Sequence, residues 1–169
     1  MNESIGSALL FKLAITFIII LSALFLSSFA YSKAYKVKNK IIEEIEKYGE
    51  SSGRQFTSES EAVNAYNSTV ATEIEDWLAS GDEGKGIGYR KSSGKANCNY
   101  NKKGAELVKG VQGKYEYCVY RINTCKNVRQ GRCGVYYHVI TYMYVEFPIV
   151  EMFPIAVHGE TRTFDVMKN

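Results

Sequence analysis

The pattern of apolar and polar positions divides the chain into two unlike parts. Residues 8–31 are apolar apart from a single charge at Lys12, and the centre of this run, residues 13–26, reads LAITFIIILSALFL. A transmembrane helix needs about 20 predominantly apolar residues. The run meets this length, because the flexible side chain of Lys12 can extend to the lipid–water interface. The pattern therefore predicts a transmembrane helix over residues 8–31, preceded by an N-terminal tail of residues 1–7.

Beyond this run, apolar side chains recur at intervals of three and four residues, as they do on one face of an amphipathic helix. These positions are Tyr31, Ala34, Tyr35, Ile41, Ile42, Ile45 and Tyr48. No proline or glycine occurs between Ser7 and Tyr48, whereas Gly49 is typical of a helix end. The sequence therefore predicts one long helix, apolar first and amphipathic over residues 32–49, followed by a polar linker at residues 50–57.

The same segment also fits a cleaved signal peptide, in which Lys12 would end the charged region and residues 13–26 would form the apolar region. The segment Ser28-Phe29-Ala30 would then offer small residues at the cleavage positions, with release after Ala30. The deciding feature is the amphipathic continuation, which favours a retained helix over a cleaved one.

Two features favour opposite sides of the membrane for the rest of the chain. Under the positive-inside rule, the lysines that follow the apolar run would keep the domain in the cytoplasm. These are Lys33, Lys36, Lys38 and Lys40. They also fit the solvated face of an amphipathic helix, and the cysteines described below favour an oxidising compartment. We therefore expect a single-pass protein of the cell membrane with an extracytoplasmic C-terminal domain.

Residues 58–169 form this domain, and their first element is a predicted helix. Ser58 and Glu61 fit a capping box, in which a serine N-cap is followed three residues later by a glutamate. The helix is predicted to continue to about Ala79, and its apolar face suits ordinary core packing. That face carries Val63, Tyr66, Val70, Ile74, Trp77 and Leu78.

The C-terminal half has the alternation of an antiparallel sheet. Residues 114–122 predict one strand, and residues 135–147 predict a long strand at the centre of the sheet. One face of the long strand would carry Val135, Tyr137, Val139, Thr141, Met143, Val145 and Phe147, and the other Tyr136, His138, Ile140, Tyr142, Tyr144 and Glu146.

Prolines interrupt the pattern after the long strand, so residues 147–154 are expected to form a bent connection or an edge segment. Residues 155–157 and 160–166 predict the last strand, with Gly159 as a bulge. The predicted fold class is α+β, with a long N-terminal transmembrane and amphipathic helix and a second helix packed on an antiparallel β-sheet.

The composition limits the range of partners. The formal net charge is only +3 and the charged residues are interspersed, which argues against a nucleic-acid partner. The chain contains 13 tyrosines, a residue that suits half-buried strand faces. Tyr136, Tyr142 and Tyr144 would form an interaction surface if they are exposed, because aromatic patches are typical of interfaces.

The cysteines, Cys98, Cys118, Cys125 and Cys133, lie in one short region. In an exported protein an even number predicts two disulfides, and the lack of a C-x-x-C pair argues against a zinc ribbon. We favour a Cys125–Cys133 bond, which would close a polar hairpin loop, with Cys98–Cys118 as the second bond. Three pairings are possible, and the sequence does not decide between them.

Candidate catalytic groups are few. His138 lies in the middle of a predicted strand, and His158 precedes Gly159 and Glu160, where a surface histidine beside a glutamate is commoner than a catalytic pair. The glycine-rich residues 84–88 lack the spacing of a phosphate-binding loop. No pair of histidines has metal-ligand spacing. We therefore expect no enzymatic activity, no cofactor, no metal and no small-molecule substrate.

Two stretches resemble a known family. The first is the long helix of residues 1–48 leading into a small α+β domain, which is the layout of type IV pilin-like proteins. The second is residues 139–155, VITYMYVEFPIVEMFPI, followed by VHGETR at residues 157–162. This looks like the end of TadE-like pseudopilins, with an alternating Val/Tyr strand, a proline-containing apolar bend and a strand that ends in small or polar residues and arginine.

The resemblance implies a membrane-anchored, pilin-like (pseudopilin) structural subunit of a surface pilus or secretion apparatus. Its partners would be the membrane and other pilin-like subunits or envelope assembly proteins. Assembly would bury apolar helix residues against neighbouring helices, namely Ile15, Ile18, Ile19, Leu21 and Phe25. The chain departs from pilins in having Phe11, not a glutamate, as the fifth residue after Gly6. The alternative is a secreted or anchored extracellular binding module with a tyrosine-rich sheet surface.

Overall fold

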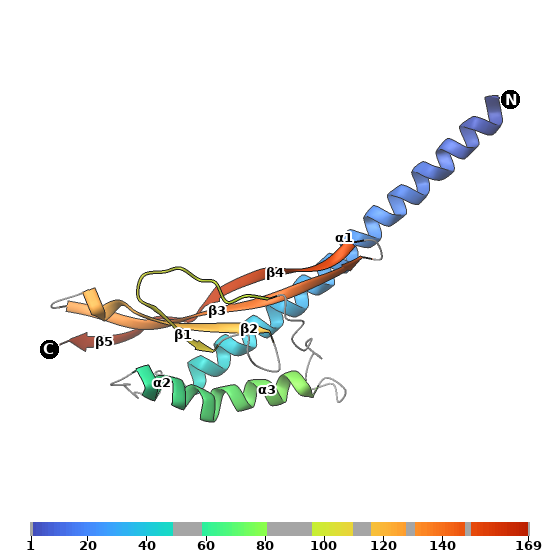
Figure 1. Ribbon diagram of the computed structural model, residues 1–169. Helices are drawn as coiled ribbons and strands as arrows, with labels where there is room; N and C mark the ends of the chain where they lie inside the picture. The colour runs from blue at the N-terminus through green and yellow to red at the C-terminus, as the bar shows by residue number, and fades with distance from the viewer. Residues whose placement is uncertain are drawn as a thin grey trace.

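A long helix projects from a small α+β domain. The computed structural model describes residues 2–48, 59–80, 96–109, 116–127, 131–147 and 150–168. Helix α1 (Asn2–Tyr48, 47 residues) runs without interruption from the projecting N-terminal end into the domain (Figure 1). The prediction of one continuous helix is confirmed, and residues 2–7, expected as a tail, belong to it. By length and composition α1 could cross a membrane, with a mean hydropathy of 2.6 in its most apolar window.

The second helical segment covers residues 59–79, as the sequence predicted. It consists of α2 (Glu59–Ala65), one turn of π-helix (Tyr66–Val70) and α3 (Ala71–Ala79). Tyr66 and Val70, at the two ends of the π turn, are both buried, so the wider turn keeps the apolar face directed at the core. The expected linker at residues 50–57 lies outside the described residues.

The sheet is antiparallel throughout. Its strands are β1 (Ala105–Lys109), β2 (Tyr117–Asn123), β3 (Gly131–Phe147), β4 (Val150–Glu160) and β5 (Phe164–Lys168). The order is β1-β2-β3-β4, and β5 pairs with the same edge of β3 as β4 does. The 17-residue β3 is therefore the central strand, as predicted. A short 3₁₀ turn (Thr124–Asn127) follows β2.

Strands β4 and β5 are separated by a bulge, which the sequence placed at the wrong residue. Gly159 pairs regularly with Val139, and the ladder shifts by one residue between the His138–Glu160 and Val135–Phe164 pairs. Thr161 satisfies the backbone of Tyr137 at this point. Its backbone N–H donates to the carbonyl of Tyr137 over 2.9 Å, and its Oγ1 accepts the N–H of Tyr137 over 3.0 Å. The bulge therefore lies at residues 161–163, not at Gly159.

Residues 147–154 were expected to form a bent connection or an edge segment, and most of them lie in an edge strand. Strand β4 begins at Val150 and continues through Pro154, which pairs with Tyr144 of β3. Proline has no backbone N–H to donate. The sheet tolerates it here because β4 is an edge strand, where a backbone N–H that faces away from β3 has no strand to bond to. The edge-segment alternative is therefore confirmed for residues 150–154, and residues 148–149 lie outside the described residues.

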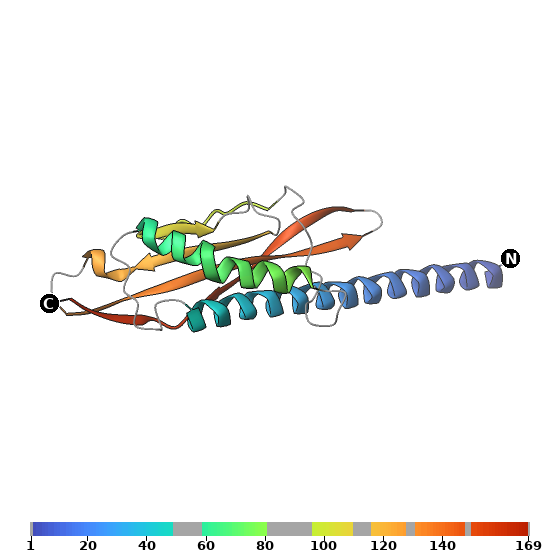
Figure 2. The same cartoon turned by 90° about the horizontal axis from the view of Figure 1, so that it is seen from below.

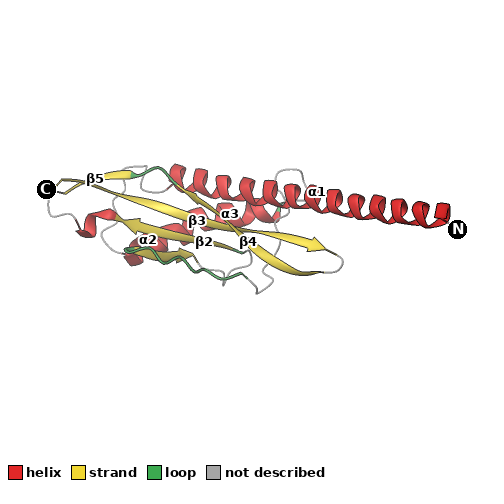
Figure 3. Ribbon diagram, turned by 90° about the horizontal axis from the view of Figure 1, so that it is seen from above, coloured by secondary structure: helices red, strands yellow, loops and turns green. Residues whose placement is uncertain are grey.

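The two faces of the sheet are covered differently. On the inner face, α1 and α3 lie side by side over the strands (Figure 2), and Val37, Ile41 and Ile45 of α1 share a core with Ile74 and Leu78 of α3. Figure 3 shows the outer face, which no described helix covers. There Tyr120, Ile140 and Tyr142 form a second, smaller cluster with the irregular segment at residues 96–104. For residues 135–142 the predicted alternation along β3 is confirmed, because Val135, Tyr137 and Val139 lie in the inner core. The side chains of residues 143–147 lie outside those described.

Candidate functional site

The projecting half of α1 is the most unusual surface of the molecule. The helix residues expected to mediate membrane insertion and assembly all lie there. Their side chains are exposed by 42–65% of their area: Ile15, Ile18, Ile19, Leu21 and Phe25. The described side chains from Ala8 to Ala30 are otherwise exposed or half-buried, and most are large and apolar. Soluble domains rarely expose so large a continuous apolar patch, and patches of this kind are typical of membrane or protein contacts.

The other half of α1 is fixed in the domain by polar and close apolar contacts. Thr141 Oγ1 on β3 donates to the carbonyl of Ala34 over 3.0 Å, at a site that is completely buried. At the far end of the helix, Glu46 Oε1 accepts the backbone N–H of Arg162, in the bulge, over 2.8 Å. Together these bonds align α1 with the sheet over several turns.

Gly159 lets α1 approach β4 closely. A side chain at this position would place its Cβ 2.6 Å from Cδ of Lys38 and 3.0 Å from Cδ1 of Ile42. The stem of Lys38 therefore packs on the strand, and its ammonium lies 4.0 Å from the ring centre of Tyr35. The glycine that the sequence suggested as a bulge instead provides room for the helix.

One predicted disulfide is present and the other is described in part. Cys98 and Cys118 are bonded, which ties the irregular segment 96–104 to strand β2 on the outer face. Cys125 is also disulfide-bonded. The side chain of Cys133 lies outside the described side chains, so the Cys125–Cys133 pairing stays a prediction.

The tyrosines expected at an interaction surface do not form an exposed patch. Tyr142 is only 5% exposed, because the segment 96–104 covers it, and its hydroxyl donates to the carbonyl of Asn97 over 2.6 Å. Burial raises the pKa of Tyr142 to about 12. Tyr136 is half-buried, and the side chain of Tyr144 lies outside the described side chains. The prediction of an exposed surface is therefore wrong for Tyr142.

Both histidines of the chain meet on the outer face, which the sequence did not predict. His138 Nε2 lies 3.0 Å from Nδ1 of His158, and His138 Nδ1 lies 3.2 Å from Oε1 of Glu160. The ring of Tyr100 stacks on His138 at a centroid distance of 3.9 Å, and Lys102 lies 3.7 Å from Glu160. The pairing of β3 with β4 brings these residues together, since His138 opposes Glu160, and Ile140, two residues further along β3, opposes His158.

The cluster constrains how these groups hold protons. Burial lowers the pKa of His138, and the nearby His158 lowers it further, whereas the bond to Glu160 acts in the opposite sense. A hydrogen bond between two imidazole nitrogens needs one of them to be unprotonated. In the described part of the chain, no group of three His, Cys, Asp or Glu side chains is arranged to hold a metal ion. The cluster thus joins the segment 96–104 to the sheet and can take up a proton.

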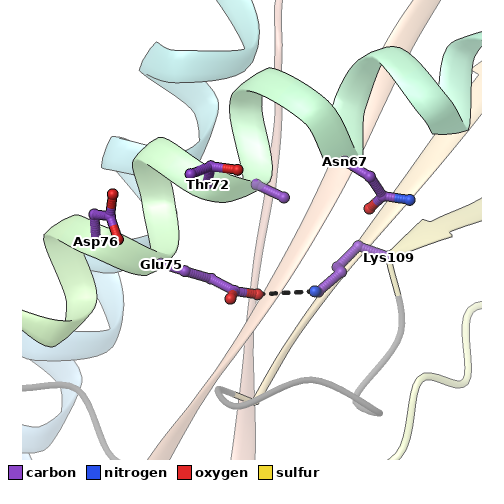
Figure 4. A pocket seen from close by; sticks show the side chains of 6 residues that line it. Asn67, Thr72, Glu75, Asp76 and Lys109 are labelled. Atoms are coloured by element: carbon purple, nitrogen blue, oxygen red, sulfur yellow. Dashed lines mark hydrogen bonds and ion pairs between the residues drawn. The ribbon is translucent and has the colours of Figure 1, made fainter.

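A shallow hollow of about 210 Å³ lies on the second helical segment. Figure 4 shows its lining, which comes from Asn67, Ala71, Thr72, Glu75 and Asp76, and from Lys109 on β1. Lys109 Nζ and Glu75 Oε1 form an ion pair of 2.9 Å across the hollow. These two opposite charges therefore compensate each other across the hollow.

Three comparisons were made with known proteins. No family model, no curated protein and no solved structure matches this chain.

Proposed function

We propose that the chain is a membrane-anchored, pilin-like structural subunit of a surface pilus or secretion apparatus, which acts by helix packing and assembly. The observation that carries this proposal is the division of one helix between two environments. Ile41 of α1 is 0% exposed in the domain core, whereas Ile18 of the same helix is 62% exposed. Because one helix is both part of the domain core and the apolar projection, it couples the domain rigidly to the membrane or to the helices that the projection contacts.

The apolar half of α1 fits a lipid bilayer first and neighbouring helices second. Burying apolar surface stabilises by about 25 cal/mol for each Å² removed from water, so the exposed half favours the membrane strongly. Within lipid, helices associate through close packing, because lipid tails are as apolar as the side chains. Membrane storage followed by lateral association with other such helices is therefore the mechanism that we propose.

The Cys98–Cys118 bond supports an extracytoplasmic position for the domain, since disulfides persist in oxidising compartments. This side of the membrane can be tested by intact-mass spectrometry of the protein from its membrane fraction, with and without reductant and alkylation. A full-length mass with protected cysteines is expected. Free thiols on a full-length chain would place the domain in the cytoplasm, and a mass that begins at Tyr31 would indicate a released protein.

Assembly through the helix can be tested with a photo-crosslinking amino acid in the full-length protein, expressed in membranes. Placed at Ile18 or Phe25, it should form adducts between copies of the chain or with other envelope proteins, because these residues lie on the projecting helix. Leu107 offers a matched control, since it is an apolar residue with 47% exposure on β1. The same adducts from Leu107, or none from the helix positions of a membrane-inserted protein, would contradict assembly through α1.

A further inference from the structure

Strands β3 and β4 run alongside α1 and continue past the point where the helix leaves the core. The bond between Thr141 and Ala34, and the bond between Arg162 and Glu46, align the sheet with the helix at two levels. Going from the Arg162–Glu46 bond to the Thr141–Ala34 bond, α1 runs towards its N-terminus, whereas β3 runs towards its C-terminal end. The C-terminal end of β3 therefore extends in the direction of the N-terminus of α1.

We call residues 143–147 of β3 and 150–155 of β4 the distal arm. At about 3.3 Å per residue, β3 covers about 20 Å between Thr141 and Phe147. At 1.5 Å per residue of helix, that length reaches from Ala34 to about the level of Leu21. Figures 1 and 2 agree with this estimate, because in both views the paired ends of β3 and β4 lie beside the projecting part of α1.

The burial of the helix gives an independent sign of the same reach. Between Ala8 and Lys33 every described side chain is exposed except those of Ala23, Ser27 and Ala30, which are half-buried. Their spacing of four and three residues, continued to Ala34, places them on the helix face that meets the sheet. The cover over this face thus extends to the level of Ala23, well inside the apolar run of residues 8–31.

The distal arm has the composition of a membrane-facing segment. Beyond Thr141, the cross-strand pairs at two-residue intervals along β3 are all apolar: Met143 with Ile155, Val145 with Phe153 and, after a shift of register, Phe147 with Val150. The charged residues of the arm are Glu146 and Glu151. Tyr144 also lies in the arm, and tyrosine is enriched at the lipid–water interface.

We infer that the distal arm is a second membrane contact of this chain, seated in the interfacial layer of the bilayer beside α1. The inference rests on the membrane anchoring proposed above. Insertion of α1 up to the level of the arm brings the arm into contact with lipid headgroups, because its tip lies at about the level of Leu21. The open edge of β4 and the two glutamates would be costly in the hydrocarbon core, so only the part of α1 that lies N-terminal to this level enters the core fully. The arm and the helix together fix the tilt of the domain on the membrane.

The test uses the full-length protein in phosphatidylcholine vesicles whose acyl chains carry bromine, a short-range quencher of tryptophan fluorescence. Trp77, the only native tryptophan, is first replaced by Trp77→Phe. In this background Phe147→Trp or Phe153→Trp reports on the arm, and Phe17→Trp reports on the anchor. Tyr48→Trp, at the domain end of α1, is the control that should keep its emission. The intact Cys98–Cys118 bond and circular dichroism confirm folding of each variant.

We expect brominated lipid to reduce the emission of Phe147→Trp and Phe153→Trp by a fraction comparable to that of Phe17→Trp, and to leave Tyr48→Trp unchanged. Quenching of Phe17→Trp alone would overturn the inference but leave the anchor in place; this is also the outcome if another protein chain covers the arm. Quenching of neither Phe17→Trp nor the arm would overturn the anchor together with the inference. Quenching of the arm without Phe17→Trp would contradict a contact made beside an inserted α1.

Discussion

The two faces of the sheet are covered in different ways. The inner face is covered by α1 and α3, whose apolar stripes recur over several helical turns and meet Val119, Val139 and Tyr137 of the sheet. The outer face is covered by the irregular segment 96–104, which supplies only a few small contacts. The inner layer is held mainly by hydrophobic packing, whereas the outer layer depends on a covalent bond, a buried hydroxyl and a histidine cluster.

A short segment can be fixed on a sheet without regular structure if a few specific contacts hold it. A helix buries one apolar residue per turn or more along its length, so the loss of any one leaves the others in place. The segment 96–104 has one disulfide at Cys98, one accepted hydrogen bond at Asn97 and one stacked ring at Tyr100. Each of these contacts should therefore affect the outer layer separately, and the following predictions test this difference.

The largest effect is expected in the inner core. Ile41→Ala should lower the free energy of unfolding by about 4 kcal/mol, because it leaves a cavity at a fully buried position. Urea denaturation in detergent micelles measures this change. Ile18→Ala, the same substitution on the exposed half of α1, should change the free energy of unfolding by less than about 0.5 kcal/mol. Equal losses for the two variants would contradict the division of α1 into a core half and a projecting half.

The second effect concerns the covalent link of the outer layer. Cys98→Ser combined with Cys118→Ser should cost about 3 kcal/mol of stability, as expected for a disulfide with a sequence separation of 20. Hydrogen exchange should increase first in the segment 96–104, while the amides of α3 stay protected. If the amides of α3 lose protection to the same extent, the two layers are not independent.

A smaller effect is expected from the buried hydroxyl. Tyr142→Phe removes the bond to the carbonyl of Asn97 and should cost about 1 kcal/mol. Chemical denaturation measures the loss, with Tyr31→Phe as the control because Tyr31 is exposed on α1. A neutral Tyr142→Phe would mean that water replaces the tyrosine as donor without cost.

The smallest effect is a pH dependence of the outer layer. The pKa of His138 is lowered by burial, so below its ordinary value of about 6.5 the unfolded chain binds more protons than the folded chain. Stability should therefore fall as the pH drops from about 6.5 towards the lower pKa of the folded state. The groups around His138 are His158, Glu160, Lys102 and Tyr100.

Denaturation of the wild type and of His138→Gln between about pH 7.5 and 5.5 checks this dependence. The variant removes the titrating ring, and the slope of stability against pH should become flatter. A steeper slope in the variant, or stability of the wild type that rises on acidification, would show instead that protonation stabilises the cluster.

Periodic elements could be predicted from the sequence, and contacts set by strand register could not. The three-and-four spacing in α1 and in residues 59–79, and the alternation along β3, follow from local geometry alone. The meeting of His138 with His158 depends on the register of β3 against β4, and the bulge that shifts this register at Thr161 has no glycine or proline to signal it. The burial of Tyr142 could not be predicted, because the segment 96–104 that covers it has no periodic pattern of apolar residues.

The uninterrupted course of α1 also has a mechanical consequence. Because no flexible linker separates its projecting half from the stripe Val37, Ile41 and Ile45, tension applied at the N-terminal end would pass along the helix backbone directly into the domain. The helix lies along β3 and β4 from the Ala34–Thr141 bond to the Glu46–Arg162 bond, so such a load acts in shear. All contacts along this length would bear the force at once instead of peeling apart one by one, and extraction of the helix from the domain would require them to fail together.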